Sequence, residues 1–160
     1  MVATLPTPAN MNQPDGDQTG REGSRTAATL QRAEAAVADL ARDYASWALR
    51  DLAKARAALA SAVTDEAQRG PQVEAVFRVA HDLKGQGSSF GFPLVTRIGH
   101  SLCALTRDRA RDYQARHLDL AKSHLDALEL VLTKGIKGEG GKVGAELVAR
   151  LESRVAEALG

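Results

Sequence analysis

Residues 112–134, DYQARHLDLAKSHLDALELVLTK, carry the most regular amphipathic pattern of the chain. Apolar residues recur there at intervals of three and four, which places them on one face of an α-helix. They are Leu118, Ala121, Leu125, Leu128 and Leu132. Because a helix with one apolar stripe is stable in water only when other structure covers it, we expect a helix from about Asp112 to Lys134 that packs against further helices.

The same spacing recurs in five further segments, which we also expect to be helices. They occupy residues 30–41, 48–63, 73–87, 94–105 and 147–158. Pro71 and Pro93 suit the first turns of two of these helices. We expect a break near Asp43 between the first two helices. The glycine-rich stretch 135–144, GIKGEGGKVG, predicts a flexible loop before the last one.

The composition supports a helical fold, since 44% of residues are hydrophobic and only 4% are aromatic, with Ala and Leu dominating the apolar set. We predict an all-α protein: an antiparallel up-down four-helix bundle with an additional N-terminal helix and a C-terminal helix packed on it. The bundle would form one domain, residues 25–160. Residues 1–24 are rich in Pro, Gly, Asn and Asp, and we expect a disordered tail there.

Charge and cysteine content exclude several classes of function. With 21 Lys and Arg against 20 Asp and Glu, the net charge of +1 gives no reason to expect general nucleic-acid or membrane-surface binding. Cys103 is the single cysteine, so an internal disulfide is impossible and a reducing, cytoplasmic location is favoured. The chain shows no secretory signal or membrane span. Because the outer face of helix 112–134 is polar beyond its single stripe, we expect a monomer.

The stretch AHDLKGQGSSFG, residues 80–91, places polar residues where a core helix gains nothing from them. On a helical wheel His81 points away from the apolar stripe and towards water. Lys84 lies one turn further and can hold a cation beside an anion attached to the imidazole. Gly85 removes the side chain that would crowd this face, although glycine costs a helix about 1 kcal/mol relative to alanine. Since imidazole is a nucleophile near neutral pH, the group favours a phosphate carrier.

His81, Lys84, Gly85 and Gly91 match the pattern H-x-x-K-G-x-x-x-x-x-G, and the segment resembles the histidine-containing phosphotransfer (HPt) domains of bacterial two-component phosphorelays. The resemblance covers about residues 44–134. It places the motif late in the third helix of a bundle, with Gly91 in the following turn. The next helix reads LCALTRD where many members have Leu-Glu. We therefore expect the docking face of this helix to differ from that of those members.

The resemblance implies that His81 accepts a phosphoryl group from the aspartate of one receiver domain and donates it to another. Lys84 would stabilise the charge of the phosphate, and Gly85 would admit the receiver. On the helical wheel Ser88 and Arg78 lie around His81, and we expect them to be docking residues as well. The partners would be receiver domains of response regulators and hybrid histidine kinases. Such a domain has no ATP site and no cofactor of its own, and Mg²⁺ is expected only in the partner receiver domain.

The remaining histidines and the cysteine predict no further chemistry. His117 and His124 lie seven residues apart, about 10.5 Å along a helix, which is too far to bind one metal ion. We interpret these two and His100 as polar residues at the boundary of the core, and Cys103 as a packing residue. No metal site is expected.

Two other functions stay open on the sequence. The first is the dimerisation and phosphoacceptor module of a histidine kinase, whose histidine is also followed by an acid and a leucine. An ATP-binding domain, which would favour it, is not visible in the 160 residues. The second is a helical adaptor that binds a receiver domain without carrying phosphate, which would need no histidine.

Overall fold

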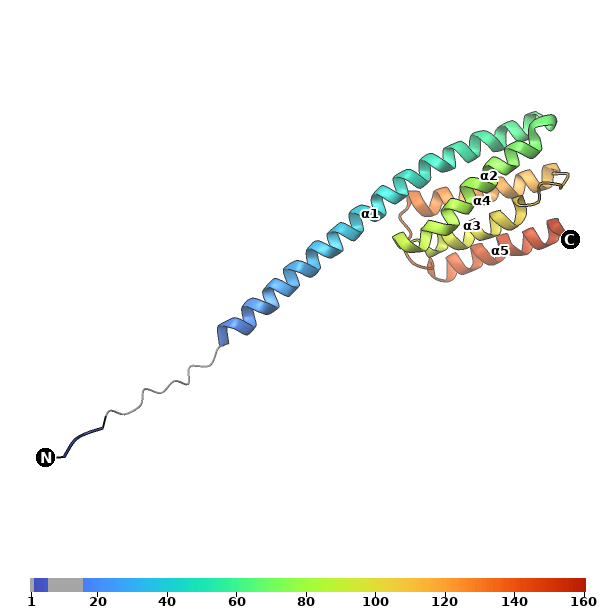
Figure 1. Cartoon of the computed structure of the whole chain (residues 1–160). Helices are drawn as coiled ribbons and strands as arrows, with labels where there is room; N and C mark the ends of the chain where they lie inside the picture. Colours follow the sequence, from blue (N-terminus) through green and yellow to red (C-terminus); the bar gives the residue numbers. More distant parts are fainter. Residues whose placement is uncertain (1, 6–15) are drawn as a thin grey trace. The chain divides into compact units, whose positions relative to one another are not determined.

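The computed structural model describes residues 2–5 and 16–160, and all regular secondary structure in them is helical (Figure 1). The α-helices are α1 (Gly16–Thr64), α2 (Arg69–Gln86), α3 (Pro93–Thr106), α4 (Ala115–Thr133) and α5 (Gly141–Leu159). Two short 3-10 helices, η1 (Glu66–Gln68) and η2 (Gly87–Phe90), flank α2. The predicted all-α fold is confirmed. None of the described helices is long and apolar enough to cross a membrane.

Helix α1 starts earlier than the sequence predicts. Residues 16–24, which were expected to belong to a disordered tail, are helical. Gly20 and Gly23 each weaken a helix by about 1 kcal/mol relative to alanine, but unlike proline they keep the backbone N–H and do not end it. The tail prediction for residues 1 and 6–15 lies outside the described residues.

The predicted break near Asp43 is wrong, because α1 continues through it to Thr64. Asp43 has no glycine or proline close by, and a single aspartate costs a helix less than about 1 kcal/mol. The additional N-terminal helix expected from the sequence is therefore the first part of α1. The chain divides into two units, Met1–Ala38 and Asp39–Gly160. That residues 25–160 form one domain stays a prediction.

In the second unit the predicted apolar stripes of α2, α3 and α4 are buried and form one core. Their buried members include Val73, Val76, Ala80, Leu83, Leu94, Ile98, Leu102, Leu105, Leu118, Leu125 and Leu128. Helix α3 contacts α2 and α4, and α5 packs against α3 and α4, as the coils of Figure 1 show. The predicted packing of a C-terminal helix on the bundle is thus confirmed, while the up-down order of four core helices stays a prediction.

Helix α4 buries more than the single stripe expected of it. Leu120, Ala127 and Val131 lie off that stripe and are also buried. The reason is that α4 contacts both α3 and α5, so two of its faces are covered. The sequence pattern showed the stronger stripe only.

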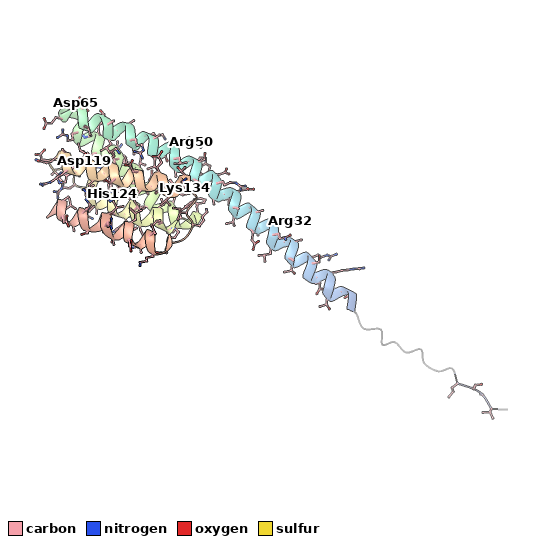
Figure 2. All side chains as sticks on the ribbon, turned by 180° about the vertical axis from the view of Figure 1, so that it is seen from behind. Arg32, Arg50, Asp65, Asp119, His124 and Lys134 are labelled. Carbon is pink, nitrogen blue, oxygen red and sulfur yellow. The ribbon has the colours of Figure 1, made fainter. Side chains whose placement is uncertain are left out.

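His117 and His124 are core residues, so their interpretation as boundary residues is wrong. His117 accepts a hydrogen bond from the backbone N–H of Gln114 (2.9 Å) and contacts the Ala158 carbonyl through Nε2 (3.2 Å). His124 is fully buried in the middle of α4, between Asp119 and Lys134 (Figure 2). Both rings satisfy their polar atoms inside the protein, which is what makes a buried histidine tolerable.

The turn after α2 is bound to the glycine-rich stretch 135–144. Gly91 ends η2 with φ of 84°, a left-handed conformation that favours glycine. Its carbonyl accepts a hydrogen bond from the N–H of Gly138 (3.2 Å), and the Lys137 ammonium lies 3.7 Å from the centre of the Phe92 ring. Residues 135–140 therefore hold the end of the motif in place and connect α4 to α5. Residues 141–144, also predicted to be loop, instead form the start of α5.

The buried His124 predicts a dependence of stability on pH. Its Nδ1 donates to the Leu120 carbonyl (2.7 Å), so its Nε2 accepts from the Ser101 hydroxyl (2.9 Å). Burial lowers the pKa of His124 below its usual 6.5, and the positive charge of Arg154 adds to this effect. A lowered pKa means that the folded state favours the neutral ring, and this stabilisation is complete above pH 6.5 and is lost as the pH falls below it.

We therefore expect the free energy of unfolding of the native protein to fall relative to that of His124→Gln between about pH 7 and pH 5. Urea denaturation at a series of pH values measures the free energy of unfolding of both proteins. The contributions of other titrating groups cancel in the difference between the two. His100→Gln is the control and should follow the native protein. Parallel curves for the native protein and His124→Gln would contradict a lowered pKa.

Candidate functional site

His81 lies on the outer face of α2, with 61% of its side chain exposed. The opposite face of the helix buries Val76, Ala80 and Leu83, so the predicted outward direction is confirmed. The His81 Nδ1 is 3.8 Å from a carboxylate oxygen of Asp82, too long for a hydrogen bond but close enough for attraction to a protonated ring nitrogen. The imidazole is therefore accessible and has an acidic neighbour on its Nδ1 side.

A hollow of about 370 Å³ opens beside the imidazole. It is lined by Phe77, Arg78, His81 and Asp82, which all belong to α2. The Phe77 ring lies one turn before His81, with 5.9 Å between the two ring centres. The Phe77 ring thus forms one wall beside the imidazole, and the hollow leaves the ring accessible from outside.

Lys84 and Gly85 follow His81 on the same exposed turn. Lys84 is half-buried and Gly85 is exposed. Apart from its own helical turn, a Cβ atom added at Gly85 would meet no atom of the described residues within 4 Å. The glycine is therefore not required by packing within the protein, and the space in front of it is free for a partner.

Of the two predicted docking residues, Ser88 has a structural contact and Arg78 an ion pair. Both the N–H and the hydroxyl of Ser88 donate to the Thr96 hydroxyl (2.9 Å each), which ties η2 to the start of α3. Arg78 is 72% exposed and forms an ion pair with Glu74 (2.8 Å). Glu74 also pairs with Arg109, which comes from the segment after α3 (2.9 Å). Arg109 thus lies beside the first half of α2, about two helical turns before His81, although it is far from Glu74 in the sequence.

Gly99 brings α3 against the turn of α2 that carries His81. A Cβ atom at this position would lie 3.1 Å from the Lys84 nitrogen, 3.2 Å from the Lys84 Cα and 3.2 Å from the Ala80 oxygen. These are backbone atoms of a helix and cannot move aside as the end of a flexible side chain can. A methyl group here would press on these atoms, so glycine favours this close approach, which supports α2 directly behind the exposed histidine.

Sequence reasoning missed three residues of this region: Phe77, Gly99 and Arg109. The spacing of Phe77, four residues before His81, was visible and could have been used. No signal in the sequence marks Gly99, because its role depends on how α3 packs. No sequence signal marks Arg109 either, because only the fold brings it close to its partner Glu74.

The remaining histidines and Cys103 do not join the site as ligands. His117 and His124 bond within the core, and His100 is exposed on α3. Cys103 is buried, and burial raises the pKa of its thiol, which agrees with a packing role. Within residues 2–5 and 16–160, no cluster of three or more His, Cys, Asp or Glu side chains could hold a metal ion.

Residues 39–131 match the family model described as Hpt domain. The match spans more than half of the chain and contains the whole segment from His81 to Gly91. The chain belongs to the Hpt domain family. Hpt domains act in histidine phosphotransfer within two-component phosphorelays and interact with receiver domains. Searches of curated proteins and of solved structures gave no match. Helix α5 and the first part of α1 lie outside the matched region of this Hpt domain protein.

The two glycines of the α2–α3 region should respond to alanine in opposite directions. Gly99→Ala forces a methyl group against backbone atoms, and we expect it to destabilise the protein by about 1–3 kcal/mol. Gly85→Ala meets open space and should stabilise α2 by about 0.5–1 kcal/mol. Thermal unfolding followed by circular dichroism measures both. A Gly99→Ala variant as stable as the native protein would show that α3 does not need this close approach.

Proposed function

We propose that this Hpt domain carries a phosphoryl group on His81, which it accepts from the aspartyl phosphate of one receiver domain and donates to the aspartate of another. The donor receiver would belong to a hybrid kinase or a response regulator. The observation that carries the proposal is the exposed imidazole of His81 within the family motif, beside Lys84 and the open space at Gly85. His100 is also exposed, but it lies outside the motif.

The proposed transfer uses Nε2 of His81 as the nucleophile, because Nδ1 faces Asp82. The Nε2 lone pair attacks the phosphorus atom, the N–P bond forms, and the P–O bond to the donor aspartate breaks so that the carboxylate leaves. The ring then carries a positive charge with a proton on Nδ1, and the Asp82 carboxylate stabilises that charge. Attack by a carboxylate oxygen of the second receiver reverses the step and returns a neutral imidazole.

Lys84 and Gly85 have separate tasks in this proposal. The Lys84 ammonium, one turn from His81, stabilises the negative oxygens of the bound phosphoryl group. Gly85 keeps the approach of the receiver clear, with Arg78 and Ser88 at the edge of the contact. Mg²⁺ would be supplied by the receiver domain, and the Hpt domain would contribute no cofactor.

The match to the Hpt family supports this function over a kinase dimerisation module. An adaptor that binds receivers without carrying phosphate is distinguished by experiment. It would bind phosphorylated receivers but remain unlabelled.

The direct test incubates the protein with phosphorylated receiver domains and follows the label. We expect acid-labile phosphate on the native protein, as for a phosphoramidate, and none on His81→Gln, with unchanged helical content. His100→Gln is the matched control and should be labelled normally. Label on His81→Gln would place the phosphoacceptor elsewhere, and an unlabelled native protein that still binds receivers would favour the adaptor.

Gly85→Leu separates docking from chemistry. The leucine should raise the melting temperature, because it replaces an exposed helical glycine. It would also stand where the receiver must approach, and a misplacement of 1 Å can slow a reaction about a hundredfold. We therefore expect receiver-dependent labelling to slow by about that factor, while a small phosphodonor labels His81 at close to the normal rate. Equal loss with both donors would mean that the substitution disturbs His81 itself, and unchanged transfer would refute the docking role.

A further inference from the structure

The net charge of +1 hides an uneven distribution of charge along the chain. Residues 69–111, which contain α2, α3 and the segment after α3, hold seven Arg and Lys residues but only three Asp and Glu. The rest of the chain holds the other fourteen basic and seventeen acidic residues. The segment that carries His81 is therefore basic by four charges, while the remainder is acidic by three.

Glu74 binds two of these arginines, Arg78 and Arg109, on the face of α2 that carries His81. Its carboxylate is only 24% exposed and pairs with both Arg78 (2.8 Å) and Arg109 (2.9 Å). The two arginine side chains are 72% and 76% exposed. One half-buried acid thus orders two guanidinium groups whose donors remain available to a partner, since each guanidinium carries five N–H donors.

The arginines lie in line with the phosphoacceptor. Glu74, Arg78, His81 and Gly85 are spaced by four, three and four residues, so they share one face of α2. One helical turn of about 5.4 Å separates Arg78 from His81, and a further turn reaches Glu74 with Arg109. Lys84 extends the positive charge on the other side of His81. The two exposed arginines therefore lie on the side of His81 towards the start of α2, and the half-buried Lys84 lies on the other side.

We propose that Arg78 and Arg109, ordered by Glu74, form a docking surface for a receiver domain whose surface around the phosphoaspartate is acidic. The inference rests on the proposed function and names the partner chemistry for that same site. A receiver that holds Mg²⁺ beside its phosphoaspartate needs carboxylate ligands there, since Mg²⁺ prefers oxygen ligands of this kind. Opposite charges on two such surfaces steer the encounter and fix its orientation, and salt weakens the effect.

The test compares Arg109→Glu with Arg150→Glu, which reverses an exposed charge on α5 outside the basic segment. We expect Arg109→Glu to slow transfer from a phosphorylated receiver about tenfold at low ionic strength, with the difference disappearing near 1 M salt, where charges are screened beyond about 3 Å. Arg150→Glu should behave as the native protein. Arg109→Gln, a milder change, should give a smaller loss in the same direction.

A small phosphodonor serves as the second measurement, since it needs no docking. It should label His81 equally in the native protein and in all three variants. If the small phosphodonor fails to label the native protein, the proposed function is contradicted. If labelling is normal but transfer from the receiver depends neither on salt nor on Arg109, only the docking surface is overturned. The protein can also be tested for binding of double-stranded DNA. If Arg109→Glu abolishes such binding but leaves transfer from the receiver unchanged, the basic surface binds nucleic acid and the proposal is overturned.

Discussion

Backbone contact between α2 and α3 at Gly99 is the constraint on which the site depends. The Ala80 oxygen and the Lys84 nitrogen bracket His81 in sequence, and both lie within about van der Waals distance of the position that a Cβ of residue 99 would take. A second close contact lies at Gly87, where a Cβ would come within 2.8 Å of the Thr96 hydroxyl. Helix α2 is thus supported from behind at two points around the motif. The buried face of α2 packs against α3, and the opposite face, which carries His81, stays exposed.

The four histidines of the protein show how position decides the chemistry of one residue type. His124 has both ring nitrogens bonded inside the core, and burial lowers its pKa, so its imidazole is held neutral and out of reach. His117 bonds to the start of its own helix and to the end of α5. His81 keeps an open face towards solvent, with an acid beside Nδ1. A nucleophile must reach its partner, and His81 combines this access with the motif of the family.

Much of this arrangement follows from patterns of apolar residues. The stripes of α2, α3 and α4 predicted which faces are buried, and the outward direction of His81 followed from the stripe of α2 alone. The break near Asp43 was wrong because a helix can continue through a stretch in which the amphipathic pattern weakens, and no proline lies there to stop it. The burial of His124 could not be predicted, since it depends on α5 covering a second face of α4. Gly99 and Arg109 act through the distance between elements, which periodicity does not encode.

Among the four histidines we propose His81 as the one that receives the phosphoryl group, with His117 and His124 as structural residues of the core. The most direct measurement records the side-chain nitrogen resonances of all four histidines by NMR before and after reaction with a small phosphodonor. We expect a large shift of the Nε2 resonance of His81, with the resonances of His117 and His124 unchanged. A shift of the His100 ring nitrogens with those of His81 unmoved would contradict this proposal.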